Sequence, residues 1–147
     1  MEAEQRKNEN VEAYNDCVIF LLTKANQKAQ GSFKKRLSIH GLTPVQNLIL
    51  ETLWEKGGLS AGEISKKLLL DNATLSGVLD RLAGTGWIIK QTDTNDRRFL
   101  RIFPTEKALE MRETLQEERT AANKNILQRF SLEEKVLLKR MLKSLQQ

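Results

Sequence analysis

Residues 60–103 read SAGEISKKLLLDNATLSGVLDRLAGTGWIIKQTDTNDRRFLRIF, and this stretch decides the fold. Two helix starts open it, because Ser60 and Glu63 form a capping box and Asp71 is a good N-cap. The second helix carries apolar residues at helical spacing and ends at the glycines of AGTG. The period then changes: WIIKQT and FLRIF are short β-branched and aromatic runs on either side of the polar DTNDRR. The stretch therefore predicts two short helices followed by a hairpin with a long tip.

Helices are expected on both sides of this stretch. Thr43, a proline and a glutamine form a strong helix start just before it. Further upstream, apolar residues at spacings of three and four predict an amphipathic helix over 8–30, which Gly31 interrupts before a short helical turn and loop. After the hairpin, the sequence predicts one long charged helix over 105–130, and Ser131 opens a terminal helix with a third capping box. The fold class is mainly α with a small β-hairpin.

Composition and charge limit the function classes. The chain has 147 residues, of which 39% are hydrophobic and 29% charged, as suits a soluble globular protein. No apolar run reaches the roughly 18–20 residues that cross a bilayer, and no secretory signal is visible, so we expect a cytoplasmic protein with no membrane partner. The net charge of +5 permits an anionic partner. Residues 64–103 are modestly enriched in positive charge, with seven basic and four acidic side chains.

Enzymatic and metal-dependent functions find little support in the sequence. One cysteine, Cys17, excludes an internal disulfide, and one histidine, His40, would have to serve any nucleophilic site. Nothing near either residue supports that role. We therefore expect no enzyme, no catalytic residues, no cofactor and no metal site.

The two short helices and the hairpin together predict a winged helix-turn-helix, whose second helix fits the major groove of double-stranded DNA. The outward face of the helix at 71–85 is small and polar, so its backbone can come close to base edges. A long arginine there can reach a guanine or the DNA backbone. The alternative is a solvated face without a partner. The predicted recognition residues are Asn72, Ala73, Thr74, Ser76, Gly77 and Arg81.

The hairpin tip carries Asp96, Arg97 and Arg98. An arginine at the tip of a wing can enter the minor groove, where narrow A·T-rich stretches concentrate negative potential. Asp96 can accept bonds from loop N–H groups or pair with one arginine, so that the other is held outward. We assign Arg98 to the groove, and Arg97 to the phosphates or to the pairing with Asp96. The alternative is a solvated turn.

At this point the chain resembles the MarR family of bacterial transcription regulators over nearly its full length. LDRLAGTGWI and DTNDRRFLRIFPTEKA are the most specific pieces, although FPTEKA departs mildly from the family's usual LTEKG. The resemblance implies a homodimer that binds a pseudo-palindromic operator, commonly as a repressor, and that releases it when a small, often anionic or aromatic, effector binds. It implies a helical dimerisation region over 1–42 and 104–147 and a winged helix-turn-helix DNA-binding domain over 43–103. The apolar stripes at 11–29 and 108–126 agree, because pairing would bury them.

Two further functions stay open. Some family members sense peroxide through a cysteine in the first helix, but the matching position here falls on Ile19, so we expect Cys17 to be a small packed residue rather than a thiol-based redox sensor. A dimeric winged-helix module that docks protein is the other alternative. His40 could line an effector pocket with Phe33, or it could lie at a turn, and the turn is favoured.

Overall fold

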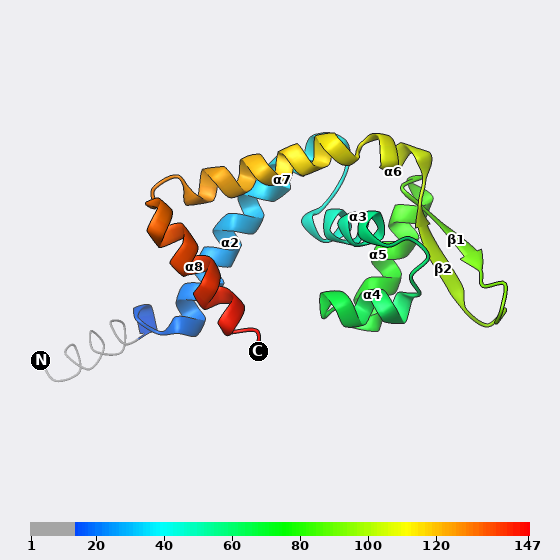
Figure 1. Cartoon of the computed structure of the whole chain (residues 1–147), viewed down its shortest axis with the longest axis horizontal. Coiled ribbons are helices and arrows are strands. Elements are labelled where there is room, and N and C mark those ends of the chain that lie inside the picture. The colour runs from blue at the N-terminus through cyan, green and yellow to red at the C-terminus, as the bar shows by residue number, and fades with distance from the viewer. Residues whose placement is uncertain (1–13) are drawn as a thin grey trace, which may run out of the picture. The chain divides into compact units, whose positions relative to one another are not determined.

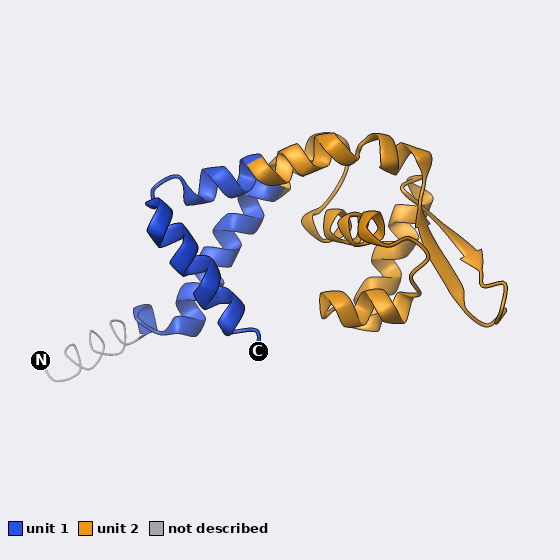
Figure 2. Ribbon diagram, viewed as in Figure 1, with its two compact units in different colours: residues 1–33, 121–147 blue, residues 34–120 orange. Residues whose placement is uncertain are grey.

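The computed structural model describes residues 14–147, which form helices and one antiparallel hairpin, so the predicted fold class is confirmed (Figure 1). The elements in chain order are α2 (Val18–Leu37), the 3-10 helix η1 (Ser38–His40), α3 (Pro44–Glu55), α4 (Ala61–Leu68), α5 (Asn72–Gly84), β1 (Ile88–Thr92), β2 (Leu100–Pro104), α6 (Glu106–Glu110), α7 (Arg112–Leu127) and α8 (Leu132–Ser144). The chain divides into two compact units, residues 1–33 with 121–147 and residues 34–120 (Figure 2). No helix among the described residues is both long and apolar enough to pass through a bilayer.

The helix starts of the second unit follow the predicted capping chemistry. The side chain of Thr43 accepts from Gln46 N, and Gln46 Oε1 accepts from Thr43 N at 2.9 Å. Ser60 and Glu63 form the same reciprocal pair at the start of α4, with Glu63 Oε2 2.7 Å from Ser60 N. These caps satisfy backbone N–H groups that have no partner within a helix. The third predicted capping box, which begins α8 at Ser131, is also confirmed.

The core of the second unit lies beneath α5. The apolar side of α5 that faces the core is buried, and α5 packs against α3, α4 and β1. Four α5 residues form that side: Leu75, Val78, Leu79 and Leu82. The apolar side chains that join them in the core include Ile49, Leu53, Ile64, Ile88 and Ile102. Burial of apolar surface stabilises the second unit by roughly 25 cal/mol for each Å² removed from water. The opposite face of α5 remains exposed.

The hairpin is held to the helices at its base. Ile88 pairs with Pro104 and Thr92 with Leu100, so residues 93–99 form the tip. Leu59, just before α4, bridges to Ile102, because Ile102 N donates to Leu59 O at 2.9 Å. This bridge joins the hairpin to the segment that leads into α4.

Gly58 makes that junction possible. Its φ is +74°, in the left-handed region, and a Cβ built on it would lie 3.0 Å from the Phe103 ring. Glycine alone adopts this conformation without steric cost and leaves room for the ring.

Two predicted helix boundaries are wrong. Gly31 does not interrupt the first helix, since α2 continues through it to Leu37. A glycine inside a helix costs only about 1 kcal/mol, and the fully buried side chain of Leu37 offsets that cost. The expected helix over 105–130 is broken at Met111, whose ψ of −3° ends α6 before α7 begins. Thr105, which begins α6, anchors that helix, because its Oγ1 donates to Gly86 O at 2.7 Å.

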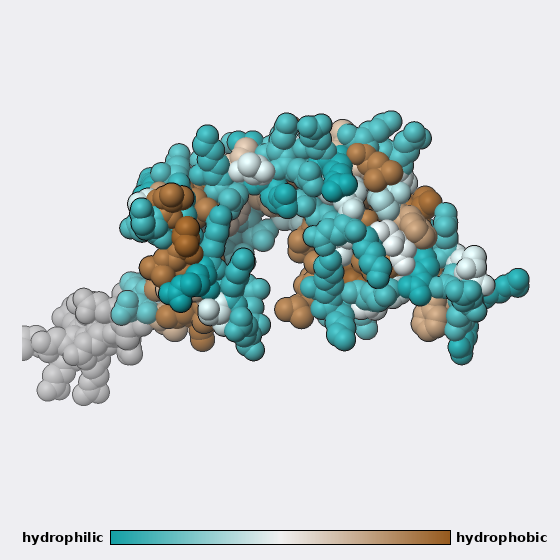
Figure 3. Space-filling view, in the orientation of Figure 1, coloured by the Kyte–Doolittle hydropathy of each residue, from teal (hydrophilic) through white to brown (hydrophobic). Residues whose placement is uncertain are grey.

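The first unit contains most of α2, the end of α7, and α8. Large apolar side chains on α2 and α8 are exposed: Val18, Ile19, Leu21, Leu22, Leu132, Val136, Leu137, Met141, Leu142 and Leu145. Figure 3 shows apolar surface gathered over α8. Within the predicted stripe at 11–29, Val11 lies outside the described residues.

Two expectations about buried surface also fail. The stripe at 108–126 is not left open for a partner, because the chain itself buries Ala108, Leu115 and Ala122. Cys17 is not packed: it is a free, exposed thiol next to the equally exposed Val18.

Candidate nucleic-acid interface

The outward face of α5 carries the predicted recognition residues. Asn72, Ala73, Thr74, Ser76 and Arg81 are exposed, and Gly77 is half-buried. The Arg81 side chain lies over Gly77, since a Cβ built on that glycine would lie 3.9 Å from Arg81 Nη2. Five of the six predicted residues therefore face solvent, and the Arg81 side chain lies over the sixth, Gly77.

The start of α5 is organised by Asp71. Its carboxylate accepts from Thr74 N at 2.8 Å and from Thr74 Oγ1 at 2.6 Å. The hydrogen bond from the Thr74 hydroxyl, followed by that from the Thr74 backbone, holds the pKa of Asp71 below its ordinary value. Because the Thr74 hydroxyl donates its proton to Asp71, its oxygen can only accept a further hydrogen bond. In this arrangement Thr74 suits a base amino group better than a phosphate.

The hairpin tip is fixed by one ion pair, and it excludes the predicted alternative in which Arg97 pairs with Asp96. Asp96 pairs with Arg98, whose Nε and Nη2 donate to the carboxylate at 3.0 and 2.8 Å, and not with Arg97. The backbone N–H of Arg98 donates to the same carboxylate at 3.0 Å. These bonds, the side-chain one first, lower the pKa of Asp96. The bidentate geometry selects Arg98 because its Nε and Nη2 meet both carboxylate oxygens at once.

A second charged cluster lies where the hairpin tip begins, and the sequence reasoning missed it. Arg101 donates from Nε to Asp93 at 2.6 Å and from Nη1 to Glu63 at 2.8 Å. The hydrogen bond from Arg101 is the largest cause that lowers the pKa of Asp93. The only sequence signal was the alternation of charges in DTNDRRFLR, which does not say which acid meets which base.

A further ion pair, also missed, joins the hairpin directly to the recognition helix. Lys90 on β1 donates to Asp80 on α5 at 2.6 Å. It joins the middle of β1 to α5.

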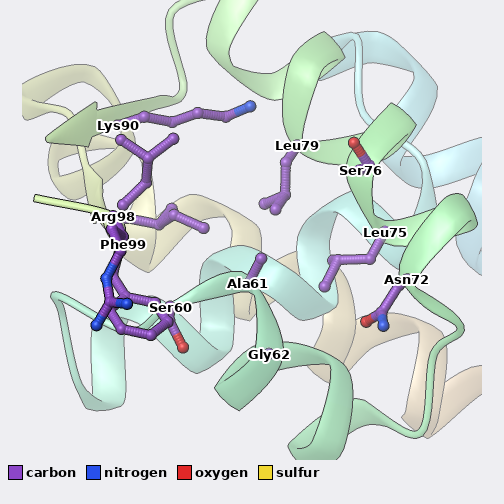
Figure 4. A pocket seen from close by; sticks show the side chains of 12 residues that line it. Ser60, Ala61, Gly62, Asn72, Leu75, Ser76, Leu79, Lys90, Arg98 and Phe99 are labelled. Carbon is purple, nitrogen blue, oxygen red and sulfur yellow. The ribbon is translucent and has the colours of Figure 1, made fainter. Parts of the chain in front are cut away.

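A hollow of about 490 Å³ lies between α5, the start of α4 and the hairpin. Figure 4 shows Arg98 and Phe99 on one side of it, Asn72 and Ser76 on the other, and Lys90 above. Its lining is mixed, with apolar side chains at the base and two cations at the rim. Two of the predicted recognition residues, Asn72 and Ser76, therefore share one concave surface with Arg98 of the predicted wing.

The two residues predicted for an effector pocket are each half-buried, Phe33 in α2 and His40 in η1. His40 lies at the turn before Gly41, as favoured from the sequence. Its Nε2 is 3.7 Å from Glu118, which also accepts from Arg36 at 2.8 Å. The bond from Arg36 is the main cause that lowers the pKa of Glu118. Among residues 14–147 no cluster of His, Cys, Asp and Glu has the arrangement of a metal site.

Comparison with known proteins places the chain in a family. The MarR family model matches residues 42–99. The HTH-type transcriptional regulator PecS of Dickeya dadantii is 30% identical over 85% of this chain and 77% of its own length. The regulator TtmR of Methylorubrum extorquens is 41% identical, but the match spans 52% of this chain and only 39% of TtmR.

Solved structures share the fold. A probable transcriptional regulator from Pseudomonas aeruginosa superposes with a TM-score of 0.85 at 29% identity, covering 89% of this chain and 98% of that one. BpsR of Bordetella bronchiseptica, whose DNA binding is regulated by 6-hydroxynicotinic acid, also gives a TM-score of 0.85, at 22% identity over 90% of this chain and 95% of its own. A MarR mutant from E. coli in complex with operator DNA gives 0.80 at 23% identity, covering 85% and 90% of the two chains. The chain belongs to the MarR family of DNA-binding transcriptional regulators.

Proposed function

We propose that the protein is a homodimeric repressor that acts in the cytoplasm, binds a pseudo-palindromic operator and releases it when a small anionic or aromatic effector binds. One observation carries the proposal: Asn72 and Ser76 on α5 and Arg98 at the hairpin tip line a single concave surface. This arrangement suits a duplex, with α5 in the major groove and the tip reaching the neighbouring minor groove.

The division of DNA contacts follows from the chemistry of the residues. Arg81 and the polar residues at the start of α5 would read bases, and the α5 N-terminus would meet a phosphate. Arg98, held by Asp96, would enter the minor groove, while the exposed Arg97 would bind phosphate. Residues 43–103 are the proposed DNA-binding domain.

Homodimer formation is supported by the exposed apolar side chains of α2 and α8 in the first unit. A contiguous apolar face of this kind costs free energy in water, and a second copy of the same face covers it. We assign this role to residues 1–42 and 104–147.

The proposed effector class rests on BpsR, whose DNA binding is regulated by 6-hydroxynicotinic acid, an aromatic acid. Phe33 and His40 stay our prediction for residues that contact the effector. Ligand-stabilised melting of the wild type and of Phe33→Ala would test that prediction.

The experiment that tests the function is fluorescence-anisotropy binding to a duplex from the protein's own upstream region, beside a scrambled duplex, at several salt concentrations. A sequence-specific regulator binds the native duplex about 10³-fold or more tightly, and its affinity falls steeply with salt. Equal and weak binding to both duplexes, repeated with other candidate operators, would favour the protein-docking module.

The exposed thiol of Cys17 gives a second candidate function, peroxide sensing. If that function holds, peroxide should release DNA from the wild type but not from Cys17→Ser. An equal response of both proteins rejects it.

A further inference from the structure

A continuous set of polar contacts runs from the start of α4 to the hairpin tip. Glu63, which caps α4 by accepting from Ser60 N, also binds Arg101 Nη1 at 2.8 Å. Arg101 Nε donates to Asp93 at 2.6 Å, at the point where the hairpin tip begins. Arg101 thus joins two segments of the chain that are far apart in sequence, because 38 residues separate it from Glu63.

Asp93 connects Arg101 to the hairpin tip. One carboxylate oxygen accepts from Arg101, and the other accepts from the backbone N–H groups of Asn95 at 2.7 Å and Asp96 at 3.2 Å. The side chain of Asp93 is only 12% exposed. Since both of its oxygens are occupied, a change in the Arg101 contact alters how Asp93 holds the turn.

This turn also sets the position of Arg98 at the tip. Asp96, whose backbone is bound by Asp93, holds the Arg98 side chain through two hydrogen bonds. Arg98 itself is 85% exposed, so no packing restrains it apart from this pair. The contacts therefore form one path, Glu63 to Arg101 to Asp93 to Asp96 to Arg98.

We propose that Arg101 is a positioning residue for DNA binding: it fixes the hairpin tip, and with it Arg98, against the start of α4. The inference rests on the proposed function, in which the tip contacts DNA. Arg101 need not touch DNA itself. Its side chain is 35% exposed and is already engaged by two carboxylates and by Gly58 O at 3.4 Å.

For Asp93 and Glu63, the proposal and simple electrostatics predict opposite changes in DNA affinity. Removing a negative charge from a surface that binds DNA should tighten binding, because the phosphates repel it less. If Asp93 and Glu63 act through Arg101, removing their charges should instead weaken binding. Asp93→Asn can still accept from the turn N–H groups, and Glu63→Gln can still complete the capping box. Asp93→Asn thus removes the oxygen that accepts from Arg101 Nε, whereas Glu63→Gln removes only the negative charge at the oxygen that accepts from both Ser60 N and Arg101 Nη1.

The experiment measures operator affinity by anisotropy for the wild type and for Arg101→Ala, Arg101→Lys, Asp93→Asn and Glu63→Gln. Each variant should weaken binding by about five- to tenfold. Lysine should not rescue, since one ammonium cannot reproduce the separate Nε and Nη1 contacts. The matched control is Glu55→Gln, which neutralises an exposed carboxylate paired with Lys67 in the same unit, outside the path. It should bind as tightly as the wild type or more tightly.

A double-mutant cycle separates positioning from direct contact. Adding Arg101→Ala to Arg98→Ala should cost little beyond the loss from Arg98→Ala alone, in affinity and in salt dependence. Additive losses, full rescue by lysine, or tighter binding by both acid variants would overturn the inference. Failure of the wild type to prefer its operator would instead overturn the proposed function. Thermal melts establish folding, and should Arg101→Ala not fold, the two acid variants carry the test.

Discussion

Arg98 lies against Asp96 in a bidentate pair, with Nε and Nη2 at 3.0 and 2.8 Å from the two carboxylate oxygens. The preceding arginine, Arg97, is exposed, and its side chain has no ion-pair partner among the described residues. One of two adjacent, chemically identical side chains is thus oriented, while the other keeps its freedom. Oriented charge suits a narrow groove, and a free charge suits the DNA backbone.

Replacement of the two arginines should therefore have different effects. Arg98→Ala should weaken operator binding by ~1–3 kcal/mol and most strongly on A·T-rich flanks, because the groove contact is lost. Arg97→Ala should weaken binding to all duplexes alike and reduce the salt dependence by about one phosphate contact. Anisotropy titrations with A·T-rich and G·C-rich flanks would measure both effects. Identical behaviour of the two variants would contradict the assignment.

Gly77 offers a test that separates DNA contact from stability. It lies inside α5, and a Cβ there would make only an ordinary contact, 3.9 Å from Arg81 Nη2. Gly77→Ala should stabilise the fold by about 1 kcal/mol, because alanine favours the helix, yet should weaken DNA binding by holding the backbone away from bases. Gly31→Ala in α2, which also has open space around its Cβ, is the control: it should stabilise the fold and leave operator affinity unchanged. Unchanged affinity in Gly77→Ala would show that α5 does not approach bases at that residue.

Leu69, between α4 and α5, holds a left-handed conformation with φ of 53° and is 90% exposed. A β-carbon costs roughly 1–2 kcal/mol in this region, and the exposed side chain makes little packing to offset it. Leu69→Gly should therefore raise the free energy of unfolding by about 1 kcal/mol in urea titrations. Leu68→Gly, within α4, should lower it. A destabilised Leu69→Gly would mean that the leucine side chain contributes more than its exposure indicates.

The exposed apolar face of α8 predicts the oligomeric state. Val136 is 61% exposed, and a charge there should disrupt a homodimer because the interface would have to bury it without a partner. Sedimentation of Val136→Glu should show monomers at concentrations where the wild type is dimeric. Lys139→Glu, an exposed change on the same helix, should leave the dimer intact. A wild type that sediments as a monomer would reject the dimer itself.

Glu118 predicts a pH dependence of stability. The hydrogen bond from Arg36 lowers the pKa of Glu118 below its ordinary 4.5. A carboxylate with a depressed pKa in the folded state stabilises the protein above its unfolded pKa, and this contribution disappears as pH falls through the folded value. The melting temperature of the wild type should exceed that of Glu118→Gln at neutral pH, and the gap should close as the pH falls through the lowered pKa of Glu118. Glu113→Gln, at an exposed site on the same helix, should show no such pattern.

Much of the local structure could be predicted from short stretches of sequence. The three capping boxes, the Asp71 cap and the buried α5 stripe each depend on residues three or four apart, and all were predicted correctly. The hairpin followed from a change of hydrophobic period over a few residues. Local backbone geometry determines such features, so a short stretch of sequence is enough to predict them.

Predictions failed where distant segments had to meet. The end of α6 at Met111 and the passage of α2 through Gly31 depend on anchoring and burial that no local pattern records. The chain itself covers the stripe at 108–126 for the same reason.

The sequence by itself determined the helix starts, the hairpin and the arginine-rich tip of this protein. Only the tertiary structure decided which charges meet: Asp96 with Arg98, Lys90 with Asp80, and Arg101 with both Asp93 and Glu63. An ion pair forms where packing brings two long side chains within a few ångströms, and in a chain with 43 charged residues many pairings are compatible with the same order of letters. The buried core beneath α5 fixes the positions of α4 and the hairpin, and those positions select the partners.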